Sequence, residues 1–269
     1  EGVVVATVIR PGLTAGVEAG ERLWWGAEGV AGGSLRGSPL EAALAGVVRT
    51  VFRERSHRLA HLGSAEVFVE YVAPPQRLVV LGAGPDVVPL VAMAAVLGWE
   101  VTVADRPSAP VQPRRFPGAH RVLALPEPGN LEALELDAGT AVVVMTHNYP
   151  LDRLLLPALL AHRPRYLGML GPRPRAERLF GEIDEDLARW DVHAPVGLDI
   201  GSDHPETVAL AILAEIQAAL AGRSGGPLRD REGPIHGAAW EWGTAVSRGG
   251  EPGEAVLASC ETRAMAHHA

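Results

Sequence analysis

The residues of this sequence best suited to chemistry follow short apolar runs that are typical of buried strands. Gly82-Ala83-Gly84 comes directly after LVVL, and glycines at such a turn let the backbone approach a phosphate closely. Asp105 ends the run VTVAD, near the offset of ~20 residues at which an acidic side chain binds a ribose in dinucleotide-binding domains. Arg106 follows, placed to meet a phosphate. These positions indicate a site for a phosphate-bearing ligand.

The glycine loop also departs from the full dinucleotide-binding pattern. Val87 stands where the third glycine is expected, and Asp86 places a negative charge beside the expected pyrophosphate. Both residues argue against ordinary NAD binding. A plain strand-to-helix turn, in which Asp86 stabilises the start of the helix, explains the loop at least as well as a pyrophosphate site.

A second polar cluster, Thr146-His147-Asn148, follows the run AVVVM, with Asp152 one helical turn further. It offers a hydroxyl, an imidazole and an amide on consecutive positions. A lone histidine is usually structural, but loops that follow buried strands often carry functional sites. This placement favours ligand contact or proton transfer by His147.

Three arginines, Arg173, Arg175 and Arg178, gather after the run YLGML, where a helix is expected to begin. A cation near the positive end of a helix costs a few tenths of a kcal/mol, up to about 1 kcal/mol. Solvated surface arginines would only tolerate this arrangement, whereas an anion bound among them would explain it. We therefore predict an anion site at Arg173 and Arg175.

Composition argues against several classes of function. The net charge of -8 and the absence of a basic tract give little support to nucleic acid as a partner. The sequence contains no lysine, so neither a Walker phosphate loop nor Schiff-base chemistry can operate. A single cysteine, Cys260, excludes an internal disulfide and a cysteine-based metal centre. We assign no catalytic residue and no metal site.

The elements that must position these residues form two domains and a tail. Residues 1–72 combine β-branched runs, a glycine-rich region and one helical pattern, which predicts a small α+β domain. Residues 73–221 alternate short apolar runs with helical segments, which predicts a Rossmann-like, doubly wound parallel α/β sheet. Residues 222–269 are rich in Gly, Pro, Arg, Glu and Ser, which predicts a mobile tail.

No segment is expected to cross a membrane. The longest apolar stretch, 87–104, is interrupted by Pro89, Gly98 and Glu100, and falls short of the roughly 18 unbroken apolar residues of a membrane span. The sequence starts without the pattern of a signal peptide. We therefore expect a cytoplasmic protein in a reducing compartment.

Four segments, in this order, resemble the xanthine dehydrogenase accessory factor family (XdhC/CoxI): VFVEYVAPPQRLVVLGAGPD, VMTHNYPLD, YLGMLGPRPRAERL and HAPVGLDIGSDHPETVALAILAEI. The likeness extends from Val5 to His236 and includes GERLWWGAEGVAGGSL and PLRDREGPIH. Family members often carry Cys where this sequence has Ser34, so a thiol function is absent at that place. Members also often have His and Gly where this sequence has Pro85 and Val87.

The resemblance implies a cytoplasmic chaperone without turnover. Such a protein binds the molybdenum cofactor (molybdopterin) as cargo, protects it during maturation, and delivers it to a molybdenum hydroxylase of the xanthine dehydrogenase or carbon monoxide dehydrogenase type. A cysteine desulfurase is a further partner that it suggests, and we expect a homodimer, with the N-terminal domain or the tail bearing Trp240 and Trp242 as contact surface. The expected binding residues are Gly82, Gly84, Asp105, Arg106, Thr146, His147, Arg173 and Arg175.

Two other functions stay open. One is an NAD(P)-dependent oxidoreductase in which His147 donates or accepts a proton, although Asp86 and Val87 predict weak nicotinamide binding. The other is a nucleotide-sensing regulatory module without transfer activity. Titration with nicotinamide dinucleotides tests the first, and a partner pull-down that lacks any molybdoenzyme would favour the second.

Overall fold

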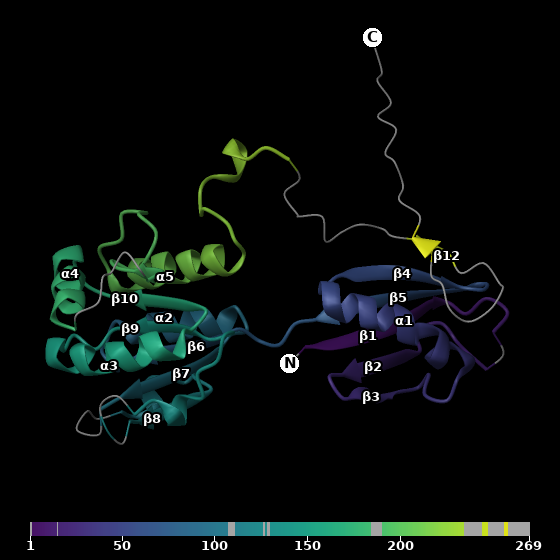
Figure 1. The fold of residues 1–269 in the computed structure, drawn as a ribbon, viewed down its shortest axis with the longest axis horizontal. Helices are drawn as coiled ribbons and strands as arrows, with labels where there is room; N and C mark the ends of the chain where they lie inside the picture. Colours follow the sequence, from purple (N-terminus) through teal and green to yellow (C-terminus); the bar gives the residue numbers. More distant parts are fainter. Residues whose placement is uncertain are drawn as a thin grey trace, which may run out of the picture. The chain divides into compact units, whose positions relative to one another are not determined.

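The computed structural model describes residues 2–14, 16–106, 111–125, 127, 130–183, 190–233, 244–246 and 256–257. The chain forms two compact units. Unit 1 comprises residues 1–74 and 231–269, and unit 2 comprises residues 75–230. The division falls between Pro74 and Pro75, after the last long strand of unit 1, and each unit is described by itself (Figure 1).

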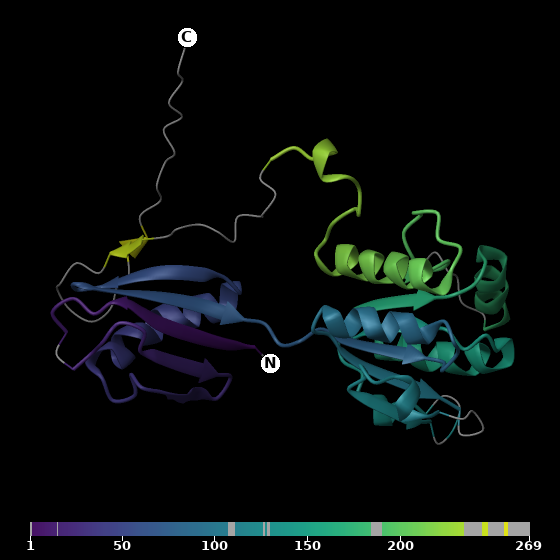
Figure 2. The same cartoon turned by 180° about the vertical axis from the view of Figure 1, so that it is seen from behind.

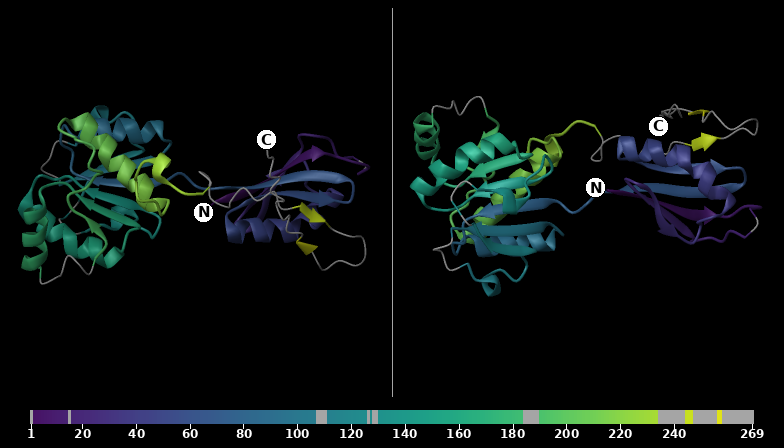
Figure 3. Two further views of the ribbon diagram at one scale, coloured as in Figure 1. Left: turned by 90° about the horizontal axis from the view of Figure 1, so that it is seen from above. Right: turned by 60° about the horizontal axis from the view of Figure 1, so that its bottom comes forward.

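Unit 1 is a mostly antiparallel sheet with one helix on a face (Figure 3). Helix α1 (Pro39–Glu54) buries Leu40, Leu44, Val48 and Val51, a spacing that lines one helical face against the sheet. The strand order is β13-β12-β4-β5-β1-β2-β3. The strands are β1 (Val3–Arg10), β2 (Arg22–Gly26), β3 (Gly29–Gly33), β4 (His57–Leu62), β5 (Ala65–Val72), β12 (Thr244–Val246) and β13 (Val256–Leu257).

The segment predicted as a mobile tail contains both β12 and β13. Strand β12 pairs in parallel with β4, and β13 pairs antiparallel with β12. Residues 222–230 are exposed and include the short 3-10 helix η4 (Leu228–Asp230). Trp240, Trp242, Cys260 and the end of the PLRDREGPIH segment lie outside the described residues.

Unit 2 is built on a six-stranded parallel sheet. From one edge its order is β8-β7-β6-β9-β10-β11, so β6 and β9 lie side by side and the chain turns in opposite directions from them. This is the Rossmann order 3-2-1-4-5-6. The strands are β6 (Arg77–Leu81), β7 (Glu100–Asp105), β8 (Arg121–Ala124), β9 (Ala141–Val144), β10 (Tyr166–Met169) and β11 (Val192–His193).

Helices cover both faces of this sheet, which is why its central strands are apolar throughout. Leu78 and Val80 of β6 pack toward α2 (Val87–Val96) and α5 (Pro205–Leu220), which lie side by side in Figure 2. Val79 and Leu81 pack on the other face with α3 (Tyr149–His162) and α4 (Arg173–Glu182). The alternation confirms the predicted α/β class, with a Rossmann-like sheet after a smaller α+β part.

Among the described residues, no helix has both the length and the apolar character needed to cross a membrane.

Candidate functional site

The glycine loop lies at the point where the connections of the sheet reverse direction. In open α/β sheets, ligands bind beside the carboxyl ends of the strands at this point, here between β6 and β9. Gly82 adopts a φ of +123°, and a Cβ there would lie 2.3 Å from the carbonyl oxygen of Met145, just after β9. Only glycine therefore lets the loop pass the end of β9 so closely.

Asp105 holds the loop from the β7 side. Its Oδ2 accepts a hydrogen bond from the N–H of Ala83 (3.0 Å), and its Oδ1 accepts one from the N–H of Arg106 (2.7 Å). Both carboxylate oxygens thus satisfy backbone donors, and each keeps a lone pair for a ligand hydroxyl. The side chain of Arg106 is exposed, and among the described residues it contacts no part of the loop. Its role as a phosphate ligand stays a prediction.

Asp86 and His147 form a pair on the β9 side of the loop. His147 Nε2 lies 2.7 Å from Oδ2 of Asp86, and because a carboxylate only accepts, Nε2 carries the proton. Asp86 stands at the N-cap of α2 but makes no capping hydrogen bond, so its side chain serves His147 and not the helix start. A Cβ on Gly84 would lie 2.4 Å from Oδ1 of Asp86, so the carboxylate packs directly on this glycine.

Two features mark this pair as unusual. His147 has a φ of 51°, a left-handed conformation that is uncommon for a residue with a side chain. Oδ1 of Asp86 is buried and has no hydrogen-bond partner. An unsatisfied buried acceptor is costly, and it fits a ligand that offers N–H groups, as the amino-substituted ring of a pterin does.

Thr146 and Arg175 meet at a buried carboxylate, that of Asp152. The Thr146 hydroxyl donates to Oδ1 of Asp152, and Nη2 of Arg175 lies 2.7 Å from Oδ2. The Asp152 side chain is only 2% exposed, so it needs a charged partner. Asn148 begins α3 by accepting a hydrogen bond from the N–H of Leu151 (3.0 Å). The network ties the end of β9 to α3 and α4.

The other two arginines of α4 pair with glutamates one turn on. Arg173 donates to Glu177 (2.8 Å), and Arg178 donates to Glu182 (2.9 Å). The hydrogen bond from Arg178 lowers the pKa of Glu182. All three arginines that the sequence grouped as an anion site thus have carboxylate partners, which removes the electrostatic reason for an anion there. Whether Arg173 and Arg175 also hold a ligand stays a prediction.

Arg115 was missed by the sequence reasoning. It ends the 3-10 helix η1 (Pro113–Arg115), and its Nη1 donates to the carbonyl oxygen of Ala83 in the glycine loop (2.9 Å). Its guanidinium carbon lies 5.3 Å from the ring centre of Phe116, which is buried. The signal available in the sequence is this arginine beside an aromatic residue in an otherwise polar, proline-rich segment.

The structure therefore brings Gly82, Gly84, Asp105, Thr146 and His147 to one edge of the sheet, together with Arg115 and Asp86. It does not bring Arg173 to them, because that side chain is exposed and pairs within α4. The described residues contain no group of three or more His, Cys, Asp or Glu side chains that could hold a metal ion.

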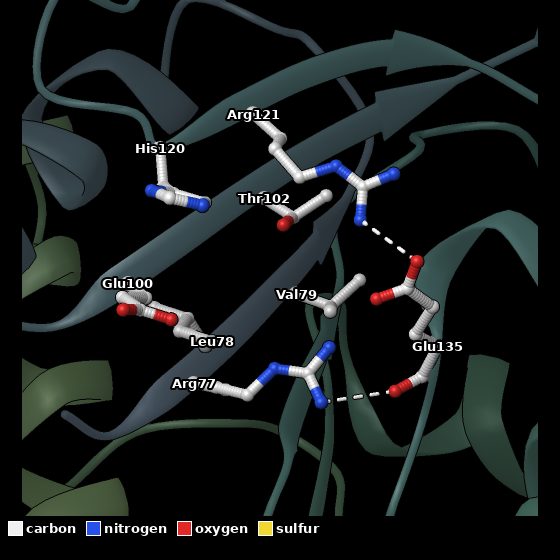
Figure 4. A pocket seen from close by; sticks show the side chains of 8 residues that line it. All are labelled: Arg77, Leu78, Val79, Glu100, Thr102, His120, Arg121 and Glu135. Atoms are coloured by element: carbon white, nitrogen blue, oxygen red, sulfur yellow. Dashed lines mark hydrogen bonds and ion pairs between the residues drawn. The ribbon is translucent and has the colours of Figure 1, made fainter. Parts of the chain in front are cut away.

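Two cavities lie away from this edge. One of about 110 Å³ lies at the amino ends of β6, β7 and β8 (Figure 4). There Arg77 donates to the carbonyl of Glu135 (3.0 Å) and Arg121 to that of Ala133 (3.0 Å), so both guanidinium groups fasten the segment around η2 (Glu132–Leu134) to the sheet. The other, about 530 Å³, lies in unit 1 and is lined by Trp25, Gly26, Ala27, Gly29, Ala45, Val48, Arg49, Phe52 and Arg53.

The fold and the loop define this chain as a protein with a Rossmann domain whose candidate site lies at the switch point. The family model described as the XdhC Rossmann domain matches residues 78–216. The chain belongs to the XdhC family of accessory factors for xanthine dehydrogenase. This confirms the resemblance that the motifs carry.

Similar proteins agree with the family. The chain is 34% identical over 178 residues to a probable xanthine dehydrogenase component of Bacillus subtilis, covering 65% of this chain and 52% of that protein. It is 33% identical over 161 residues to the uncharacterized protein YqeB of Escherichia coli, covering 57% of this chain and 29% of that protein. The matched region thus spans about half the length of these relatives, or less.

A solved structure described as a xanthine dehydrogenase from Bacillus halodurans has a similar fold. The TM-score is 0.53 at 20% identity, over 82% of this chain and 90% of that chain. At this identity the likeness supports the fold alone.

Proposed function

We propose that this chain binds the molybdenum cofactor as cargo at the carboxyl edge of its parallel sheet and delivers it to a molybdenum hydroxylase of the xanthine dehydrogenase or carbon monoxide dehydrogenase type. Family membership supports an accessory role of this kind. The observation that carries the proposal is the polar ring around Gly82-Ala83-Gly84. It offers a guanidinium group on one side and an unsatisfied carboxylate oxygen on the other.

The ring suits this cargo because the cargo has two different ends. A pterin presents amino and amide N–H groups, for which Asp86 is an acceptor, and its side chain ends in an anionic phosphate, for which arginine is the preferred partner. Asp105 keeps lone pairs for hydroxyl groups. The proposal assigns no catalytic base, because a carrier needs to bind and release its cargo without turnover.

The partners in this proposal are the client hydroxylase and a cysteine desulfurase that sulfurates the bound cofactor, and the place of action is the cytoplasm. The chain acts as a homodimer in this scheme.

The direct test is anaerobic incubation of the full chain with cofactor released from a purified molybdoenzyme. Bound pterin is then separated by gel filtration and measured by fluorescence after acid oxidation. We expect saturable binding with a defined stoichiometry. No saturable binding, while a known carrier binds in parallel, would refute the proposal.

The strand order and the position of Asp105 favour a second candidate, an NAD(P)-dependent oxidoreductase. Asp86 opposes it, since its carboxylate packs on Gly84 beside the expected pyrophosphate position. Calorimetric titration with NAD(H) and NADP(H) separates the two functions. Tight binding of either nucleotide would favour the oxidoreductase, and we expect weak binding.

A further inference from the structure

Among the arginines near the carboxyl edge of the sheet, Arg115 differs from those of α4. Arg173, Arg175 and Arg178 each form an ion pair with a carboxylate. Arg115 forms none within the described part of the chain, and instead donates to the carbonyl of Ala83. Its charge is therefore not neutralised by a neighbouring side chain.

The guanidinium of Arg115 is also held in place. The hydrogen bond to the loop carbonyl (2.9 Å) and the contact with the buried ring of Phe116 restrain it against the glycine loop. A guanidinium has five N–H donors, and only one of them is used here, so several remain for a ligand. Restraining such a group before binding reduces the entropy that a ligand would have to overcome.

The two sides of the loop carry opposite chemistry. The β7 side presents the cation of Arg115, whereas the β9 side presents the carboxylate of Asp86 and the imidazole of His147. An anion on the β9 side would meet a like charge, and an anion on the β7 side would meet a guanidinium with free donors. Arginine binds phosphate oxygens through two parallel N–H groups, which adds direction to the attraction.

We propose that Arg115 binds the anionic phosphate of the cargo on the β7 side of the glycine loop, so that the ring bearing N–H groups lies toward Asp86 and His147. The identity of the cargo rests on the proposed function, but the anion site itself does not. This orientation differs from the one that the sequence favours, in which the phosphate lies at Arg173 and Arg175.

The test uses Arg115→Met in the full chain, since methionine keeps much of the apolar stem beside Phe116 and removes the charge and the donors. Arg114→Met is the matched control, because its guanidinium is exposed and donates to Gln112 and not to the loop. Arg173→Met tests the competing orientation. Arg115→Lys keeps the charge without the paired donors, and near-ultraviolet circular dichroism checks that each variant is folded.

The probes are the fluorescent pterin phosphate obtained by acid oxidation of the cofactor and the same pterin after removal of its phosphate. We expect Arg115→Met to weaken binding of the phosphorylated form at least tenfold and to change the other form less than twofold. Arg115→Lys should give an intermediate loss, and Arg114→Met and Arg173→Met should give none. Unchanged affinity in Arg115→Met, or a loss in Arg173→Met instead, would overturn the inference.

Titration with inorganic pyrophosphate keeps this result separate from the proposed function. If the wild-type chain binds neither pterin, the proposed cargo is wrong. Pyrophosphate binding that disappears in Arg115→Met would then still support the anion site, whereas equal binding by both proteins, or none by the wild type, would overturn it.

Discussion

Replacing Arg175 by methionine removes the cation that faces the carboxylate of Asp152, a side chain that is only 2% exposed. The carboxylate would keep its hydrogen bond from Thr146 but would lose its charge partner. Arg173→Met is the matched control two residues away on the same helix, because Arg173 and Glu177 are both largely exposed.

The expected magnitudes differ strongly. Breaking a buried ion pair by removing one partner costs about 3–5 kcal/mol. Arg175 is itself 23% exposed and Thr146 remains, so we expect the lower end, about 3 kcal/mol. For a domain of this size, this lowers the melting temperature by roughly 6–12 °C. An exposed pair such as Arg173–Glu177 contributes about 0–1 kcal/mol.

Differential scanning calorimetry of the full chain measures both variants, with the transition of unit 2 compared between them. The double variant Asp152→Leu with Arg175→Met should recover much of the loss, because it removes the buried charge together with its partner. If Arg175→Met and Arg173→Met lower the melting temperature equally, Asp152 does not depend on Arg175 and the reasoning from burial is wrong.

The remaining predictions concern two glycines and the response to pH. Gly82→Ala should destabilise unit 2 by more than about 2 kcal/mol in urea unfolding, since its Cβ would strike the backbone of Met145 at a φ of +123°; a near-neutral effect would contradict this. Gly46→Ala, inside α1, should stabilise unit 1 by about 0.5–1 kcal/mol, because nothing lies within 4 Å of the added Cβ, and a loss of stability would contradict it. The hydrogen bond from Thr140 is the main cause that lowers the pKa of Asp137 below its ordinary value of 3.8. A lowered carboxyl pKa stabilises the fold above the unfolded-state pKa, and this stabilisation is lost as the pH falls through the folded-state pKa. Urea midpoints should therefore fall below about pH 4, and less so in Asp137→Asn; identical pH profiles would refute the assignment.

The sequence by itself determined the class of fold and the position of the ligand edge. Strands such as LVVL and AVVVM are apolar at every position, and this pattern occurs where helices cover both faces of a parallel sheet. Gly82 and Asp105 were found because their signals are local, a glycine after a strand and an acid at the end of the next. The two-residue strand β11 carries no periodic signal and was not predicted.

Only the tertiary structure decided which side chains pair across that edge. Asp86 lies 61 positions from His147 and Arg115 lies 32 positions from Ala83, and no local pattern connects such residues. Their partners depend on the register of β6 against β7 and β9 and on how each loop leaves its strand. The same holds for Arg175: the sequence shows a cluster of cations, and only the packing of α3 against α4 shows that each has a carboxylate of its own. Charge counted along a chain therefore identified candidate ligand residues, while charge left unpaired in the fold pointed to Arg115.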